Sequence, residues 1–377
     1  MTHLKSRPIL PVLLAILLGN AARFPASAAD ADKVEDGRNT HIASGHTIDP
    51  HLQKIVEDEL EKAAAEIHPQ KIIAVFADVK TGKILAMASR PERTGEPGQA
   101  HKHVSNDAIS FCFEPGSIFK VVACAGFLKE GLGDEKTKIF CENGAFACGG
   151  KTIKDYEPYG DLTPHEILVK SSNIGSAKMG LKLGAAKFWE TVSSFGFGRK
   201  TGIELPGESE GTLIQADRID ELVLSRMAFG QVAAVTPIQV LMAYAAIANC
   251  GLLFPPTLVS DPKAQKPTGV RILPETVAAF IAKALASSVP ELAHVDGLSV
   301  AGKTGTTQAI APDGSYAKDQ YVTSFAGYFP AENPKFVGVV VVDRATVDEE
   351  INYGGLVAAP IFSRIVSRFY PVKVNSP

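Results

Sequence analysis

The chain has 377 residues, 45% of them hydrophobic and 21% charged, with 38 Lys and Arg against 41 Asp and Glu and a net charge of −3. This composition is typical of a folded globular protein with a large core and excludes a disordered or low-complexity chain. The near-neutral charge argues against nucleic acid as a partner, because binding to phosphates requires a basic surface.

The first thirty residues have the pattern of an export signal. Lys5 and Arg7 precede an apolar stretch over residues 9–18, and the triplet Ala-Ser-Ala follows at 26–28. The stretch has about half the length that a membrane-spanning helix requires. The pattern therefore favours a cleaved signal peptide over residues 1–28 rather than an uncleaved membrane tether. In both cases the protein is exported, to the periplasm or the cell envelope.

Residues 29–47 are polar and without periodicity, which indicates a linker. A single domain is expected over 48–371, followed by a short tail at 372–377, because no repeat or boundary divides this part of the chain. The domain opens with apolar residues at helical spacing over 50–67, which predicts an amphipathic helix.

One β-hairpin is predicted near each end of this domain. Apolar, β-rich runs at 72–79 and 83–89 flank a Lys-Thr-Gly turn, and a second pair at 322–329 and 336–343 flanks a Pro-containing connection. Helices fill the sequence between and after the hairpins, at 117–131, 236–249, 274–287 and 357–368. This order predicts an α+β domain in which the terminal strands pair in one antiparallel sheet.

Ser117 and Lys120 lie in the first turn of the 117–131 segment, which is apolar on almost every side and is therefore expected to be buried. Positions i and i+3 share a helix face. A serine needs a base to become a nucleophile, and burial and the helix dipole both lower the pKa of a lysine toward that role. The pair fits a nucleophile and its base; the alternative is a capping serine followed by a lysine with a buried stem.

Ser171-Ser172-Asn173 is the only Ser-x-Asn sequence in the chain, and it follows an apparent short helix that starts at Thr163. Such a turn can present a hydroxyl that relays a proton and an amide that holds a substrate carbonyl. An ordinary helix cap explains the same residues.

Lys-Thr-Gly occurs three times, starting at residues 80, 200 and 303. In the third copy Lys303 offers a positive charge, and Thr304 and Thr306 offer hydroxyls, to a substrate carboxylate. Gly305 is expected to let the substrate backbone approach. Spacing does not choose among the three copies, and the apolar context before the third favours it.

The cysteines and histidines indicate no metal site. Cys141 and Cys148 lie in a Gly-rich loop. The sequence allows either a local disulfide between them or two free thiols. No Cys or His spacing matches a zinc site, so neither a metal nor a cofactor is expected.

The segments EPGSIFK, SSN and KTGT, in this order, resemble the three signature motifs of penicillin-binding proteins. LQKIVEDELE, VKTGKILAMASRP, GFGRKTGIELPGE, SFAGYFPAENPKF and YGGLVAAPIF are similar to the transpeptidase domain of the class B enzymes, which act in cell elongation and division. The resemblance covers about residues 48–370. It implies the penicillin-binding, serine β-lactamase-like fold, with a central antiparallel sheet flanked by helices and an all-helical subdomain.

The resemblance also implies roles for the motif residues. Ser117 would be the acylated nucleophile and Lys120 its base, while Ser171 would relay the proton to the leaving D-alanine and Asn173 would hold the substrate amide. The backbone N–H groups of Ser117 and Thr306 would form an oxyanion hole. The terminal carboxylate would bind to Lys303, Thr304 and Thr306.

Peptidoglycan stem peptides are the substrates that the resemblance implies, with β-lactams as covalent inhibitors. A membrane glycosyltransferase is the partner that it implies. Class B proteins usually carry a long N-terminal pedestal and an uncleaved anchor, and here about twenty linker residues and a short apolar segment stand in their place.

A D,D-transpeptidase is the favoured reading. A D,D-carboxypeptidase, which uses water as acceptor, is a close alternative. A class D-like or other serine β-lactamase ranks lower, because the chain has no Glu-x-x-Leu-Asn sequence and carries Asn173 where another class has Val. A non-catalytic penicillin sensor or scaffold is the reading outside enzymes, and the presence of all expected catalytic side chains weighs against it.

Overall fold

The computed structural model describes residues 46–91, 106–260, 268–347 and 353–370. The predicted signal peptide, nearly all of the predicted linker and the predicted C-terminal tail lie outside these ranges. Within them, no helix is both long and apolar enough to cross a bilayer.

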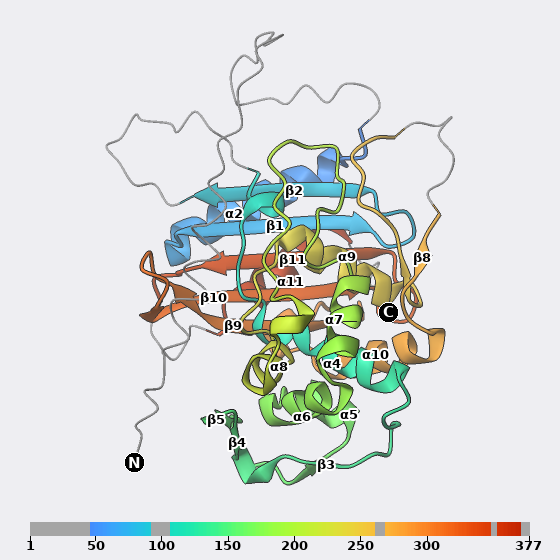
Figure 1. The fold of residues 1–377 in the computed structure, drawn as a ribbon. Coiled ribbons are helices and arrows are strands. Elements are labelled where there is room, and N and C mark those ends of the chain that lie inside the picture. Colours follow the sequence, from blue (N-terminus) through green and yellow to red (C-terminus); the bar gives the residue numbers. More distant parts are fainter. Residues whose placement is uncertain (1–45, 92–105, 261–267, 348–352, 371–377) are drawn as a thin grey trace, which may run out of the picture.

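A five-stranded antiparallel sheet forms the centre of the molecule, with the strand order β2-β1-β11-β10-β9 (Figure 1). Strand β1 pairs with β11 along its whole length, which joins the hairpins from the two ends of the domain, as predicted. Strand β9 lies at one edge of the sheet. The strands are β1 (Lys71–Asp78), β2 (Ile84–Pro91), β9 (Ala301–Ile310), β10 (Tyr316–Phe329) and β11 (Phe336–Asp343).

Two helices cover one face of the sheet: α2 (Pro50–Ile67) and α11 (Ala358–Phe369). Alternate residues of β1 and β11 point toward them, and Phe362 of α11 stacks on Phe76 of β1, with ring centroids 5.7 Å apart. Asp49 caps α2 by accepting two backbone N–H groups. The predicted bounds of α2, 50–67, are confirmed. The predicted bounds of α11, 357–368, both lie one residue before the bounds in the structure.

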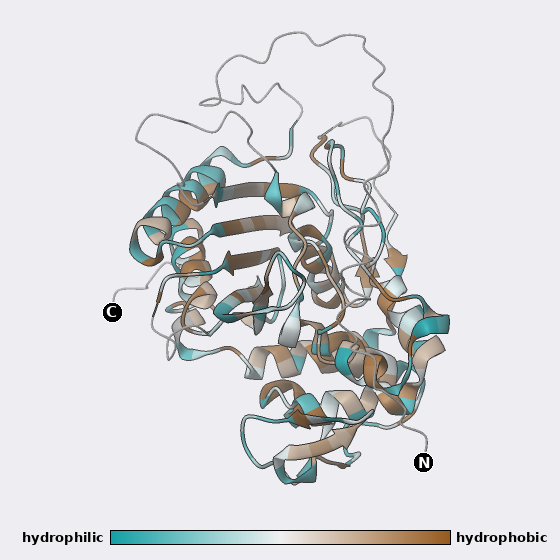
Figure 2. Cartoon of the chain, turned by 60° about the vertical axis from the view of Figure 1, so that its left-hand side comes forward, coloured by the Kyte–Doolittle hydropathy of each residue, from teal (hydrophilic) through white to brown (hydrophobic). Residues whose placement is uncertain are grey.

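The opposite face of the sheet packs on α9 (Pro237–Ala248), all of whose residues are buried. Its start matches the sequence signal: Thr236 and Gln239 form a reciprocal capping box, and Pro237 occupies the first helical position. Figure 2 shows the central strands, on which this helix packs, as predominantly hydrophobic. The Tyr244 hydroxyl donates to the carbonyl of Ile118 (2.9 Å), which ties α9 to the segment that carries Ser117.

The remaining helices form a helical part beside the β9 edge of the sheet (Figure 1). The fold is therefore the predicted α+β class with a helical subdomain. The helices of this part are α4 (Lys120–Lys129), α5 (Pro164–Val169), α6 (Asn173–Leu183), α7 (Ala185–Ser194), α8 (Glu221–Met227) and α10 (Glu275–Ser287). The short α3 (Asp107–Ser110) is the exception, because it packs against β1, β2 and α9. Two short strand pairs belong to this part: β3 (Ile139–Phe140) with β6 (Asp161–Leu162), and β4 (Ala145–Cys148) with β5 (Lys151–Lys154). A third pair, β7 (Leu252–Leu253) with β8 (Val270–Arg271), follows α9 and packs on it.

Candidate active site

Ser117 lies in a single 3₁₀ turn, Gly116–Phe119, that runs directly into α4 at Lys120. The sequence predicts both residues in the first turn of an α-helix, and the structure corrects this to a 3₁₀ turn followed by the helix. In a 3₁₀ turn, side chains at i and i+3 eclipse one another. The backbone N–H of Lys120 donates to the carbonyl of Ser117, so the two side chains leave the turn on the same side.

Glycines hold this turn in place. Gly116 has a left-handed φ of +56°, and its N–H donates to the carbonyl of Gly230 (2.9 Å). A Cβ on Gly230 would lie only 2.1 Å from the Gly116 carbonyl oxygen. The turn is also bound to the sheet, because the Thr307 hydroxyl donates to the carbonyl of Glu114 (3.1 Å).

Lys120 is fully buried at 0% exposure. Its Nζ donates to the hydroxyl of Ser171 (3.0 Å) and also to the Ser171 carbonyl. Burial holds the pKa of Lys120 well below its ordinary value, the positive charge of Lys303 lowers that pKa further, and the carboxylate of Asp155 opposes both effects. A buried amine with a depressed pKa can be neutral and accept a proton.

The Ser171–Asn173 turn joins α5 to α6. Ser171 has a left-handed φ of +57° and faces Lys120, whereas Ser172 is the helix cap, accepting the N–H of Gly175 (2.9 Å). Asn173 is the first residue of α6, and its Nδ2 donates to the carbonyl of Lys154 (2.9 Å). The alternative of an ordinary helix cap is therefore correct for Ser172. Ser171 is not part of the cap, and its hydroxyl is hydrogen-bonded to Lys120.

The third motif lies on edge strand β9. Lys303 is buried, which lowers its pKa to about 8. Thr304 and Thr306 lie on the other face of the strand and are partly exposed. The Thr306 hydroxyl accepts the N–H of Gly354 (3.0 Å), which leaves its own O–H free to donate to a ligand.

Gly305 has a packing role on β9. A Cβ at this position would lie 2.4 Å from the hydroxyl of Ser324 and 2.7 Å from the carbonyl of Pro115. Glycine therefore lets the strand approach the loop just before Ser117. Room for a substrate backbone, expected from the sequence, stays a prediction.

The other two Lys-Thr-Gly copies have partners of their own. Lys80 lies in the β1–β2 turn, and its Nζ donates to the side-chain oxygen of Asn249, which follows α9 (3.1 Å). Thr201 donates its backbone N–H to Glu208 (2.6 Å) within a loop. The third copy lies on β9, which packs against the Ser117 turn, and the charge of its Lys303 lowers the pKa of Lys120.

Sequence reasoning missed two acidic residues beside the motifs. Glu114 is buried and accepts the N–H of Val232 (2.8 Å) and the hydroxyl of Tyr316 (3.1 Å), and burial raises its pKa to about 7. Its place in EPGSIFK, directly before the nucleophile turn, was an available signal. Asp155, which contacts the Ser171–Asn173 turn, lies in a polar stretch that gave no signal.

Cys141 and Cys148 are both free thiols in the structure. Cys141 lies 3.5 Å from the carbonyl oxygen of Ile139, and Cys148 lies 3.9 Å from that of Glu221. Of the two alternatives open from the sequence, the structure has the free thiols.

A family model described as the penicillin binding protein transpeptidase domain matches residues 72–367. The chain belongs to this family. The match confirms the resemblance seen in the three motifs, and this penicillin-binding protein domain has curated relatives of the class B type. It is 34% identical to stage V sporulation protein D of Bacillus subtilis, over 93% of the chain and 56% of the relative.

A second relative is the peptidoglycan D,D-transpeptidase FtsI of Escherichia coli, 33% identical over 88% of the chain and 57% of the relative. The chain thus spans little more than half the length of these relatives. Among solved structures, it is similar to the transpeptidase domain of Burkholderia pseudomallei penicillin-binding protein 3, with a TM-score of 0.79 and 30% identity over 89% of the chain and 98% of that domain. It is also similar to penicillin-binding protein 3 of Mycobacterium tuberculosis, complexed with ampicillin. The TM-score is 0.76 and the identity is 29%, over 86% of the chain and 77% of that protein chain.

Proposed function

We propose that this penicillin-binding protein domain is a D,D-transpeptidase that cross-links peptidoglycan stem peptides through an acyl-serine intermediate on Ser117. The observation that carries the proposal is the buried Lys120 amine, 3.0 Å from the Ser171 hydroxyl and on the same side as Ser117. Relatives named peptidoglycan D,D-transpeptidases support the same reaction.

In the first half-reaction the Ser117 hydroxyl attacks the carbonyl of the D-Ala-D-Ala bond, and neutral Lys120 takes its proton. The oxyanion that forms binds the backbone N–H groups of Ser117 and Thr306. The proton then passes through the Ser171 hydroxyl to the leaving nitrogen as the C–N bond breaks. D-alanine departs and the acyl group stays on Ser117.

The substrate is held by the second and third motifs. Asn173 binds the substrate amide, and the hydroxyls of Thr304 and Thr306 bind the terminal carboxylate. The positive charge of Lys303, on the other face of β9, attracts the same carboxylate through space. A β-lactam carries a carboxylate and a reactive amide, so it reacts with Ser117 as a covalent inhibitor. In the second half-reaction an amine of a neighbouring strand attacks the acyl-serine.

The proposed place of action is the periplasm or the cell envelope, since several relatives are named peptidoglycan D,D-transpeptidases and the first 28 residues have a signal-peptide pattern. A membrane glycosyltransferase as protein partner is part of the proposal by resemblance alone.

The acceptor distinguishes the two closest functions. The protein is incubated with a stem pentapeptide ending in D-Ala-D-Ala, with and without an amine acceptor such as a second stem peptide. A transpeptidase releases D-alanine and forms the peptide dimer. Release of D-alanine with only the hydrolysed tetrapeptide would instead identify a carboxypeptidase. No release with wild type, together with no acylation by β-lactams, would favour the scaffold.

The two lysines predict a bell-shaped pH dependence for kcat/KM of acylation. Activity falls on the acidic side as Lys120 gains a proton, and it falls above pH of about 8 as Lys303, whose pKa is about 8, loses the charge that binds the carboxylate. The profile is measured with benzylpenicillin from pH 5 to 10.

Lys303→Arg is the control for the alkaline limb, because arginine keeps its charge over this range. The limb is expected to vanish in this variant while the acidic limb stays. The control is needed because Glu114, with a pKa of about 7, also titrates nearby. An alkaline limb that is unchanged in Lys303→Arg contradicts the role of Lys303.

A further inference from the structure

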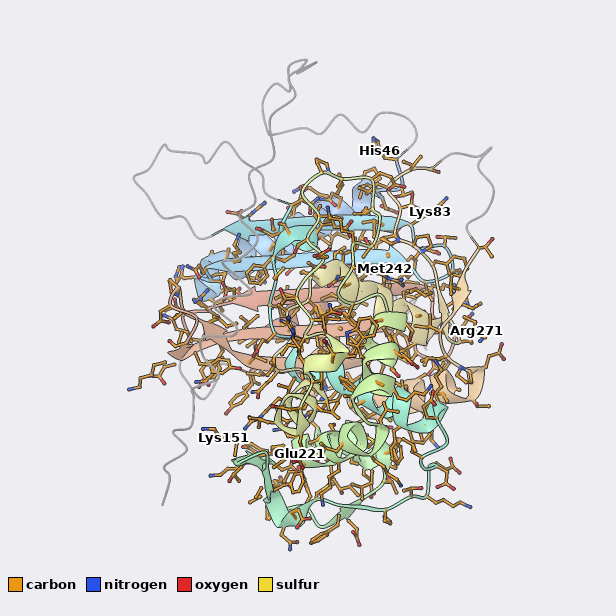
Figure 3. The ribbon with its side chains drawn as sticks, viewed as in Figure 1. His46, Lys83, Lys151, Glu221, Met242 and Arg271 are labelled. Carbon is orange, nitrogen blue, oxygen red and sulfur yellow. The ribbon has the colours of Figure 1, made fainter. Side chains whose placement is uncertain are left out.

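Asp155 reaches the second motif from a separate hairpin, β4–β5. It directly follows β5, and its backbone N–H donates to the carbonyl of Gly144 (3.2 Å), at the start of β4. The hairpin rests against the beginning of α8, where the Cys148 thiol lies 3.9 Å from the carbonyl oxygen of Glu221. Figure 3 labels Lys151 of this hairpin and Glu221 of α8 in the lower left part of the molecule. Asp155 therefore extends from a supported element, which limits its freedom to move.

The carboxylate of Asp155 accepts three hydrogen bonds from the turn. Ser172 donates its hydroxyl (2.6 Å), and the backbone N–H groups of Asn173 (2.5 Å) and Ile174 (3.0 Å) donate as well. An ordinary cap is already supplied by Ser172, which accepts the N–H of Gly175. Together the two side chains satisfy the first N–H groups of α6 and fix the turn that contains Ser171.

Asp155 also acts on Lys120 through its charge. Two influences of opposite sign reach the buried Lys120 amine from other elements: the Lys303 ammonium on β9 lowers its pKa, and the Asp155 carboxylate raises it. Hydrogen bonds link the same two groups, since Asp155 holds the turn and Ser171 in that turn binds Lys120.

We propose that Asp155 is a positioning residue for acyl transfer, which fixes the Ser171–Asn173 turn against Lys120 and balances the charge of Lys303 there. The inference rests on the proposed acyl-serine function. It assigns to a residue outside the three motifs a part in both the geometry and the charge of the base.

Other titratable groups also face this pair. Cys141 lies 3.5 Å from the Ser172 hydroxyl, and burial and Asp155 both raise the pKa of its thiol, so it stays neutral. Burial, Glu157 and Asp155 likewise raise the pKa of Tyr159. Lys303 stays protonated below a pH of about 8. Below that pH, Lys120 is the group in this set that is expected to gain a proton as the acylation rate falls. Glu114, with a pKa of about 7, also titrates in this range, but its partners are Val232 and Tyr316, so removing the charge of Asp155 is expected to move only the Lys120 limb.

The test measures acylation of the full chain by benzylpenicillin as a function of pH below 8, for wild type and Asp155→Asn. The variant loses a charged hydrogen-bond acceptor, and the plateau rate is expected to fall roughly 10- to 100-fold. Removing the negative charge lowers the pKa of Lys120 further, so the acidic limb is expected to move to lower pH. A loss of local order alone would lower the plateau without moving the limb.

Two variants separate the contributions. Ser172→Ala removes the hydroxyl bonded to Asp155 but keeps the charge, so it is expected to lower the plateau with the limb in place. Asp217→Asn makes the same chemical change at an exposed residue of the 3₁₀ turn Ala216–Arg218 and is expected to match wild type. Folding of Asp155→Asn is judged by thermal unfolding, and if this variant does not fold, Asp155→Glu is used instead. Asp155→Glu keeps the charge, so the plateau of the acylation rate is expected to fall while the acidic limb stays at the same pH.

An Asp155→Asn protein that reacts at the wild-type rate, or one that slows with its limb unmoved, would overturn the inference. So would an Asp155→Glu protein with an unchanged plateau. Failure of wild type itself to acylate would refute the proposed function instead, so the two failures are distinguishable.

Discussion

Replacing Lys120 with alanine is expected to slow acylation of Ser117 by about 10³-fold or more, because general-base catalysis contributes typically 10² to 10⁴. The variant also loses the hydrogen bond to Ser171. The rate is measured by intact-mass spectrometry after mixing with benzylpenicillin, and the fold is checked by circular dichroism. Acylation within tenfold of wild type would refute the role of Lys120 as base.

Two controls make the Lys120 result specific. Lys120→Met fills the same buried space without an amine; it should be as inactive as the alanine variant and at least as stable as wild type, since burial disfavours the charged lysine. Lys129→Ala removes the exposed lysine at the end of the same helix and is expected to react at the wild-type rate.

Gly230→Ala is expected to damage both stability and acylation. Gly230 has a φ of +86°, and the new Cβ would lie 2.1 Å from the Gly116 carbonyl oxygen, backbone that cannot move without shifting Ser117. Backbone strain and overpacking together predict a loss of roughly 2–5 kcal/mol in the free energy of unfolding. Acylation should fall by about 100-fold or more, because misplacement of a reacting group by about 1 Å costs that much.

Gly131→Ala is the matched control for this prediction. Gly131 also has a left-handed φ, +65°, but a Cβ there would meet no atom within 4 Å. Gly131→Ala therefore measures only the cost of placing a non-glycine residue at a left-handed φ, about 1 kcal/mol in the free energy of unfolding. It should leave the acylation rate unchanged. Equal effects from the two substitutions, in denaturant unfolding and in acylation rate, would show that the contact with Gly116 is unimportant.

Several helices and both predicted hairpins of the domain could be predicted because local patterns determine them. The capping signal at Thr236 and Pro237 places the start of α9, and the β-rich runs around residues 80–82 give β1 and β2. The buried environment of Lys120 also follows from the apolar sequence around it. The 3₁₀ turn at Ser117 did not follow, because a spacing of three residues fits a 3₁₀ turn and an α-helix alike.

Contacts between distant parts of the chain could not be predicted from local patterns. The choice of the third Lys-Thr-Gly copy depends on β9 lying at the sheet edge next to the Ser117 turn, which only the tertiary structure and the family resemblance supply. Asp155 is a clearer case, since nothing in its polar sequence context indicates that the hairpin delivers it to α6.

The most direct test of the account is the intact mass of the protein after incubation with benzylpenicillin, with Ser117→Ala alongside. The acyl-serine mechanism predicts a stable adduct of one benzylpenicillin on wild type and none on the variant. Absence of an adduct on wild type, or an equal adduct on Ser117→Ala, would contradict the acyl-serine mechanism. An adduct that forms and quickly disappears would contradict the transpeptidase assignment in favour of a β-lactamase.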